Sequence, residues 1–278
     1  KMERYRQIYQ RVHHEQQKVS RQTPGVAKNL KDKMHAVKSM GRRFEREKEQ
    51  MTKRPDFEES IVVRFEDSIT IPQGKVILDL YLETLKAGDS LLSRDVRLKI
   101  VGPKKVCIVG ANGSGKTTLV REILAELEKR GINYGYMPQD YSEGMNPHKN
   151  AIQYLTQTGT KREHTMVRTY LGSMNLTAEE MHHPLVELSG GQRAKLYFSK
   201  MIIDRAVVLV LDEPTRNISP LSGPEIRAAL KEFGGCIIAV SHDRKFITEV
   251  FEEVLLLERT GLTTINGADL QNLTWTQG

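Results

Sequence analysis

A short apolar run leads directly into a glycine-rich loop in the stretch Val106-Cys107-Ile108-Val109-Gly110-Ala111-Asn112-Gly113-Ser114-Gly115-Lys116-Thr117. The loop fits the pattern Gly-x-x-x-x-Gly-Lys-Ser/Thr, which is typical of a phosphate-binding loop. The amphipathic residues from Thr118 to Arg130 predict a helix that follows the loop and presents its positive end to the same anion. A strand, a phosphate loop and a helix in this order predict an α/β fold.

The loop pattern assigns a set of residues to nucleotide binding. Backbone N–H groups of a glycine-rich turn point at phosphate oxygens. Lys116 is expected to reach the β and γ phosphates, and the Thr117 hydroxyl is expected to coordinate Mg²⁺. The predicted cofactors are therefore ATP and Mg²⁺, and the loop residues expected to bind them are Gly110, Ala111, Asn112, Gly113, Ser114, Gly115, Lys116, Thr117 and Thr118.

A second apolar run, Val207 to Leu211, ends in the acidic pair Asp212 and Glu213. Ligands of a parallel sheet gather at the carboxyl ends of its strands. Asp212 is suited to hold Mg²⁺, directly or through water, and Glu213 is suited to polarise the attacking water as a general base. We therefore expect Lys116 and Glu213 to be catalytic residues of a single ATP site.

Helices and apolar strands alternate in the second half of the chain: Gln192 to Asp204, Val207 to Leu211, Pro224 to Phe233 and Cys236 to Val240. Strands without polar alternation predict a parallel sheet that is buried on both faces. Earlier in the chain, strands are expected at Ile61–Phe65 and Val76–Leu82, with a turn at residues 72–74 between them.

Charge divides the chain in two. Residues 1–54 contain 16 Lys and Arg against 6 Asp and Glu, a net charge of +10, and the remainder carries −3. Helical periodicity around Thr23-Pro24-Gly25, and Pro55 after the second helix, predict a basic helical hairpin over residues 1–54. Such a charge favours binding to a phosphate backbone. A solvated helical spacer and a helix at a membrane surface are the alternatives.

The chain has no apolar segment long enough to cross a bilayer and no signal-peptide pattern. Its two cysteines, Cys107 and Cys236, lie in apolar strand-like runs. They are typical of buried thiols in a reducing compartment. The predicted location is cytoplasmic.

Three segments in fixed order complete the pattern: the phosphate loop, Leu188-Ser189-Gly190-Gly191-Gln192, and the strand that ends at Asp212-Glu213. Together they resemble the ATP-binding cassette (ABC) superfamily over about residues 60–260. The resemblance implies that Ser189, Gly190, Gly191 and Gln192 contact the ATP of an opposing cassette, so that one cassette cannot complete its own site. It also implies that Gln139 contributes to the Mg²⁺ site and that His242 is a catalytic residue near the γ-phosphate.

Within that superfamily the chain resembles the ABC-F class of translation factors and ribosome-protection or antibiotic-resistance proteins. The class is similar in lacking a membrane part, in its short helical insert and in a basic helical linker before its second cassette. The resemblance implies a linker at 1–54 and an ABC cassette at 55–278, with a mainly parallel central sheet, an antiparallel β subdomain and a helical subdomain at about 144–190. The implied partners are a second cassette and ribosomal RNA bound through residues 1–54, with no membrane.

Two departures from the family pattern stand out. Ala87 occupies the position where the family has an aromatic residue that stacks on adenine. After Glu213-Pro214-Thr215, the class has Asn-His-Leu-Asp, whereas this chain has Arg216-Asn217-Ile218-Ser219. ATP hydrolysis that switches a ribosome-binding factor between bound and released states is the predicted function. The ATPase subunit of a membrane transporter and an ATP-gated dimerisation module with little turnover are the alternatives.

Overall fold

The computed structural model describes residues 34, 63, 65, 69–220 and 222–266. The chain divides into two compact units, Lys1–Phe57 and Glu58–Gly278. The predicted basic hairpin over 1–54 and its boundary with the cassette lie outside the described residues, apart from Met34, so both stay predictions. The helices and strands that the structure describes in full belong to the second unit.

A six-stranded sheet forms the centre of this unit, in the order β4-β5-β6-β3-β7-β8. The first five strands are parallel to one another, and β8 pairs antiparallel with β7. The strands are β3 (Lys105–Val109), β4 (Tyr134–Met137), β5 (Val208–Asp212), β6 (Cys236–Val240), β7 (Glu253–Glu258) and β8 (Gly261–Ile265). The predicted parallel sheet is confirmed.

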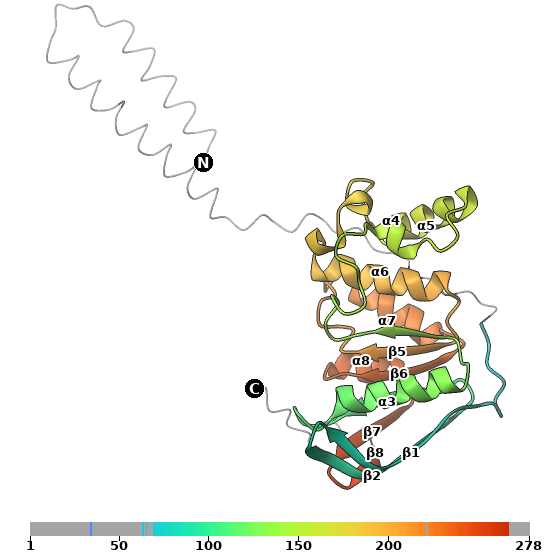
Figure 1. The fold of residues 1–278 in the computed structure, drawn as a ribbon, viewed down its shortest axis with the longest axis vertical. Helices are drawn as coiled ribbons and strands as arrows, with labels where there is room; N and C mark the ends of the chain where they lie inside the picture. Colours follow the sequence, from blue (N-terminus) through green and yellow to red (C-terminus); the bar gives the residue numbers. More distant parts are fainter. Residues whose placement is uncertain (1–33, 35–62, 64, 66–68, 221, 267–278) are drawn as a thin grey trace, which may run out of the picture. The chain divides into compact units, whose positions relative to one another are not determined.

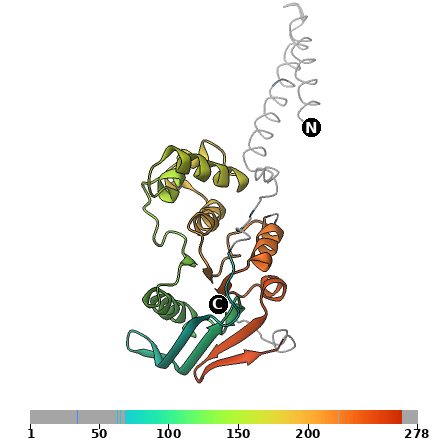
Figure 2. The same ribbon diagram turned by 90° about the vertical axis from the view of Figure 1, so that its right-hand side faces the viewer.

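Both faces of the sheet are buried because alternate residues of each strand enter different hydrophobic clusters. In β5, Val208 and Val210 pack in the cluster that contains helix α3 (Lys116–Lys129). Leu209 and Leu211 pack in the cluster that contains helices α7 (Gly223–Glu232) and α8 (Arg244–Val250). Figure 2 shows α3 on one side of the sheet and these helices on the other. Polar and apolar residues do not alternate in β5 because both of its faces are buried.

A two-stranded antiparallel sheet packs beside α3 (Figure 1). It consists of β1 (Val76–Ala87) and β2 (Ser90–Val101), joined through Gly88, which has a φ of +57°. The strand predicted at Val76–Leu82 is therefore present and extends to Ala87.

The strand predicted at Ile61–Phe65 is not supported, because the two described residues of this stretch, Val63 and Phe65, lie in no strand. Val63 is buried, and the ring of Phe65 packs on that of Phe233 at a centroid distance of 4.8 Å. The apolar character of Val63 and Phe65 thus reflects packing against the hydrophobic core without membership in a strand. A short apolar run alone does not separate these two cases.

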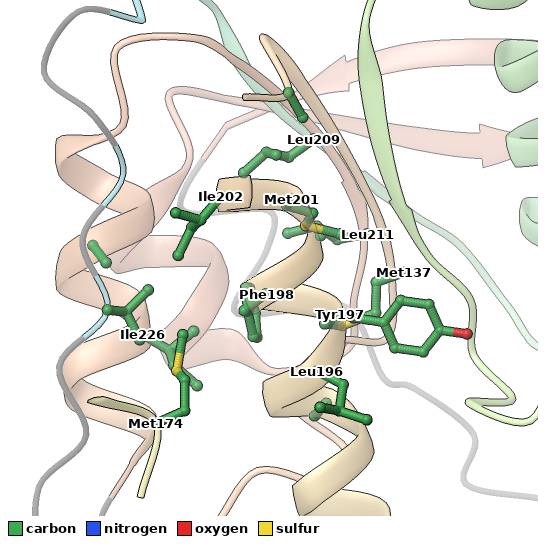
Figure 3. Packing of buried hydrophobic residues seen from close by; sticks show 14 of the residues in the cluster. Met137, Met174, Leu196, Tyr197, Phe198, Met201, Ile202, Leu209, Leu211 and Ile226 are labelled. Atoms are coloured by element: carbon green, nitrogen blue, oxygen red, sulfur yellow. The ribbon is translucent and has the colours of Figure 1, made fainter. Parts of the chain in front are cut away.

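The segment predicted as a helical subdomain contains α4 (Ala151–Leu155), α5 (Lys161–Ser173) and two 3₁₀ turns at Glu180–His182 and Leu185–Glu187. Helix α6 (Gly190–Ile203) joins this segment to the sheet. Figure 3 shows how Phe198, Met201 and Ile202 of α6 pack among residues of the same cluster. A separate helical subdomain at about 144–190 stays a prediction. Within the described residues, no helix combines the length and the apolar character needed to cross a membrane.

Packing of α6 predicts a large loss of stability for the Phe198→Ala variant. Phe198 is fully buried. Its truncation is expected to lower the free energy of unfolding by about 3–5 kcal/mol, since a cavity replaces the ring. Urea unfolding followed by circular dichroism measures this loss. The matched control, Val186→Ala, removes an apolar side chain that is 60% exposed and is expected to change stability by less than about 0.5 kcal/mol. Equal effects of the two substitutions would contradict the packing described.

Candidate functional site

The glycine-rich loop connects β3 to α3 through two residues in the left-handed region. Gly113 has a φ of +77°, and Gly115, the N-cap of α3, has a φ of +100°. A Cβ atom on Gly115 would lie 2.9 Å from the Leu92 side chain. The loop therefore needs glycine at position 115 for its backbone conformation and for its close approach to β2.

Lys116 begins α3, and its amino group lies within the concave side of the loop. Its Nζ donates to the carbonyl oxygens of Gly110 at 2.8 Å and Ala111 at 2.9 Å. Burial lowers the pKa of Lys116, while the charges of Glu213 and Asp212 act in the opposite direction. Two backbone carbonyls of the loop thus hold the Lys116 ammonium group, which lies within the electrostatic influence of Glu213 and Asp212.

Asp212 ends β5 and is almost fully buried. Its Oδ2 accepts a hydrogen bond from the Thr117 hydroxyl at 3.0 Å. Burial raises the pKa of Asp212, whereas the Thr117 hydrogen bond and the Lys116 charge lower it. The structure therefore brings together Thr117 of α3 and Asp212 of β5, two of the residues that the sequence assigned to Mg²⁺.

Glu213 follows in the left-handed region, with a φ of +53°, and its N–H donates to the Val240 carbonyl at 2.9 Å. Its Oε2 accepts the His242 N–H at 3.4 Å, and its Oε1 lies 3.5 Å from His242 Nε2. Burial raises the pKa of Glu213 to about 7, and burial lowers the pKa of His242. Burial thus favours the uncharged form of both groups.

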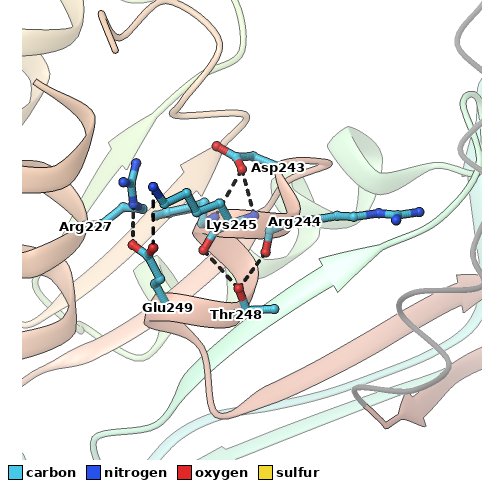
Figure 4. A network of polar contacts seen from close by, with 7 residues as sticks. Arg227, Asp243, Arg244, Lys245, Thr248 and Glu249 are labelled. Carbon is cyan, nitrogen blue, oxygen red and sulfur yellow. Dashed lines mark hydrogen bonds and ion pairs between the residues drawn. The ribbon is translucent and has the colours of Figure 1, made fainter. Parts of the chain in front are cut away.

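The residue after His242 anchors this segment (Figure 4). Asp243 caps α8 by accepting the N–H groups of Lys245 and Phe246 at 3.0 and 3.1 Å. An ion pair between Arg227 and Glu249 links α8 to α7. The position of His242 beside Glu213 is thus fixed by helix capping and by the packing of two helices.

Gln139 lies just beyond β4, in a segment that is tied to the segment after Glu213. The Tyr141 hydroxyl donates to the Pro214 carbonyl at 3.2 Å. Tyr141 is buried, so this hydrogen bond exchanges little with water.

One cavity of about 560 Å³ gathers most of the predicted site residues. Of the predicted set it is lined by Asn112, Gly113, Gly115, Lys116, Thr117, Thr118, Gln139, Asp212, Glu213 and His242. Gly110 contributes its carbonyl to Lys116, and Ala111 and Ser114 line an adjoining cavity of about 480 Å³ that shares Asn112 and Gly113 with the first. The phosphate loop, the acidic pair, Gln139 and His242 are therefore one site.

Ser189 and Gly191 line a different cavity, of about 380 Å³. Ser189 is the N-cap of α6: its Oγ accepts the Gln192 N–H at 3.2 Å, and the Gln192 Oε1 accepts the Ser189 N–H at 2.8 Å. Gln192 also donates to Glu180 at 2.6 Å. The Gln192 side chain, which the sequence assigned to nucleotide binding, is thus used to hold the start of α6. Gly190 lies against Asn217, where a Cβ atom would be 3.1 Å from its side chain.

The site also contains residues that the sequence reasoning did not assign. Ala87, which marked the missing aromatic residue, lines the main cavity together with Leu92, Val240 and Arg216. Leu92 and Val240 carry no signal in a single sequence, because apolar residues in strands are usually core. Arg216 had a signal: it stands three residues beyond Glu213 and departs from the family pattern.

The residues at the cavity fit a Mg²⁺ ion bound together with phosphate. Within the described residues, no group of three or more His, Cys, Asp and Glu side chains is placed to hold a metal ion. Asp212 and Thr117 supply one carboxylate and one hydroxyl oxygen, 3.0 Å apart. Mg²⁺ commonly takes one or two protein oxygens and completes its shell with phosphate and water.

Residues 93–216 match the family model described as "ABC transporter". The chain is 30% identical over 233 residues to the ribosome protection protein VmlR of Bacillus subtilis, covering 81% of this chain and 42% of that protein. It is also 30% identical over 224 residues to human ATP-binding cassette sub-family F member 3, covering 76% of this chain and 31% of that protein. The chain therefore spans less than half the length of these relatives.

Among solved structures, the fold is similar to the ATP-binding cassette MJ0796, whose structure is described as a dimer in a post-hydrolysis state bound to ADP and Pi. The TM-score is 0.58 at 21% sequence identity, and the match covers 69% of this chain and 100% of that chain. This likeness confirms the predicted cassette fold.

The capping at the start of α6 predicts that Ser189 stabilises the fold. Ser189→Ala removes the acceptor for the Gln192 N–H and is expected to lower the free energy of unfolding by about 1 kcal/mol. Ser189→Asp keeps an acceptor at the N-cap and is expected to retain most of the stability. Urea unfolding measures both variants, and an alanine variant as stable as the wild type would contradict a capping role.

Proposed function

Because the chain carries an ATP-binding cassette of the ABC superfamily and is similar to ABC-F proteins, we propose that it hydrolyses ATP and thereby switches a ribosome-binding factor between bound and released states. The observation that carries this proposal is that Lys116, Asp212, Glu213 and His242 line one cavity. Lys116 begins the helix that follows β3, Asp212 and Glu213 lie at and just after the end of β5, and His242 follows β6. Together they supply the charges that phosphoryl transfer needs.

Each residue has a proposed role. The loop amides and Lys116 bind the β and γ phosphates. Thr117 and Asp212 hold Mg²⁺, with Gln139 beside it, and the ion neutralises phosphate charge when it is bound. Glu213 accepts a proton from the attacking water, and His242 orients the Glu213 carboxylate through the contact between Oε1 and Nε2.

Separation of the two cavities supports a requirement for a second cassette. Ser189 and Gly191 line a cavity to which Lys116 and Glu213 do not contribute. A nucleotide bound at Lys116 therefore lacks the contacts of the Ser189 segment of its own chain, and a second cassette would supply them. The partner is either another part of a longer protein or a second copy of this chain.

Ribosome binding is supported by the similarity to one relative and by charge. VmlR is named a ribosome protection protein. Residues 1–54 of this chain carry a net charge of +10, which suits the phosphate backbone of ribosomal RNA. A transporter ATPase subunit and an ATP-gated dimerisation module are the competing functions. A cytoplasmic location stays a prediction, consistent with the burial of the free thiols of Cys107 and Cys236.

The pKa of Glu213 predicts the pH dependence of hydrolysis. A general base acts only when deprotonated, so kcat/KM is expected to rise about tenfold per pH unit below about pH 7 and to level off above it. Burial lowers the pKa of His242, which favours its neutral form. Phosphate release at saturating Mg²⁺ measures the profile, with Lys116→Ala as the inactive control. A flat profile between about pH 5.5 and pH 8 would contradict the role of Glu213.

Co-sedimentation tests the ribosome-binding function. Glu213→Gln removes the general base but keeps the shape of the side chain, so the ATP-bound form should accumulate. The E213Q chain is expected to sediment with ribosomes in ATP and not in ADP at moderate salt.

Charge reversal provides the matched control for that experiment. Replacing Arg42, Arg43 and Arg46 by Glu in the E213Q chain is expected to abolish co-sedimentation, because these residues lie in the basic segment. Replacing the exposed cassette residues Lys86, Arg94 and Lys129 by Glu changes the net charge equally and is expected to retain it. Absence of ATP-dependent co-sedimentation for E213Q would refute ribosome binding by this chain.

A further inference from the structure

Arg216 occupies a position between the two cavities. It lines the cavity of Lys116 and Glu213 and also the cavity of Ser189 and Gly191. No other described residue lines both. Apart from Lys116, it is the one permanent cation among the residues that line the main cavity in the described part of the chain.

The backbone around Arg216 is held in place on both sides. Its N–H donates to the Glu213 carbonyl at 3.2 Å, closing a tight turn. The Tyr141 hydroxyl fixes the intervening Pro214 carbonyl at 3.2 Å. The next residue, Asn217, lies against Gly190 and Gly191. The backbone that carries Arg216 is therefore held by hydrogen bonds.

The Arg216 side chain is one of those that line the main cavity, and its charge acts on Glu213 and Tyr141. Burial raises the pKa of Glu213 and of Tyr141, and the positive charge of Arg216 opposes this rise at each of them. The side chain is exposed, and among the described residues it forms no ion pair. Its five donors are thus available to an anion that enters the cavity.

The other residues that line the cavity are apolar in one group and polar in another. Ala87 and Leu92 supply apolar surface without donors, and the loop amides with Lys116 supply the phosphate site. The proposed hydrolytic carboxylate, Glu213, shares the cavity lining with three other polar residues: Gln139, His242 and Arg216. The group of a nucleotide that lies beside that carboxylate is the terminal phosphate. A guanidinium binds phosphate oxygens in a bidentate fashion.

We propose that Arg216 binds the γ-phosphate of the nucleotide held by Lys116, so that the site discriminates nucleoside triphosphates from diphosphates. The inference rests on the proposed nucleotide site and adds to it a residue that senses the terminal phosphate. Loss of that phosphate on hydrolysis would release Arg216 at the border of the second cavity, which ties the state of one site to the residues that face a partner.

Binding of a non-hydrolysable ATP analogue and of ADP, each with Mg²⁺, tests the proposal by calorimetry on the full chain. Arg216→Ala is expected to weaken binding of the ATP analogue about tenfold and binding of ADP less than about twofold, because only the former has a γ-phosphate. Arg216→Lys keeps the charge but not the planar fork and is expected to be intermediate. Arg162→Ala, an exposed arginine of α5, is the control and is expected to match the wild type.

The outcomes separate this proposal from the nucleotide site on which it rests. If Lys116→Ala abolishes binding while Arg216→Ala leaves it unchanged, or weakens both nucleotides equally, the site stands and the role of Arg216 is refuted. If the wild type binds neither nucleotide, the proposed function itself fails. Circular dichroism of each variant establishes that it is folded.

Discussion

The hydrogen bond from Thr117 to Asp212 joins two segments that are 95 residues apart in sequence, and the site depends on it. It can form because β3 and β5 both pair in parallel with β6, so that their carboxyl ends meet at one edge of the sheet. Two-sided burial fixes the register of β5, since alternate residues enter different hydrophobic clusters. The core of the cassette thus determines where its acidic residues lie.

The sequence predicted those parts of the molecule whose conformation depends on nearby residues in the chain. The phosphate loop at Gly110–Thr117 has a backbone conformation that requires glycine at some positions. Strand β5 is a continuous apolar run that ends in acidic residues. Both could be assigned without knowing what they pack against. The connection between them required only that the sheet be parallel, which the alternation of strands and helices indicated.

What the sequence left open has its cause in tertiary contacts. Val63 and Phe65 are apolar because they pack on the rest of the core, including Phe233, and a period-two pattern does not reveal this. Gln192 was assigned to the nucleotide by resemblance, yet its amide is used by Ser189 and Glu180. Arg216 drew notice as a departure from a pattern, and only the cavities show that it borders both sites.

The left-handed conformation of Glu213 has a consequence for how the chain trades stability against activity. A non-glycine residue at a φ of +53° costs on the order of 1 kcal/mol or more. Glycine at position 213 would relieve that strain and would also remove the carboxylate and its burial. If Glu213 is the proposed general base, a substitution that relieves this strain would also remove the activity, so selection for stability alone would act against the residue.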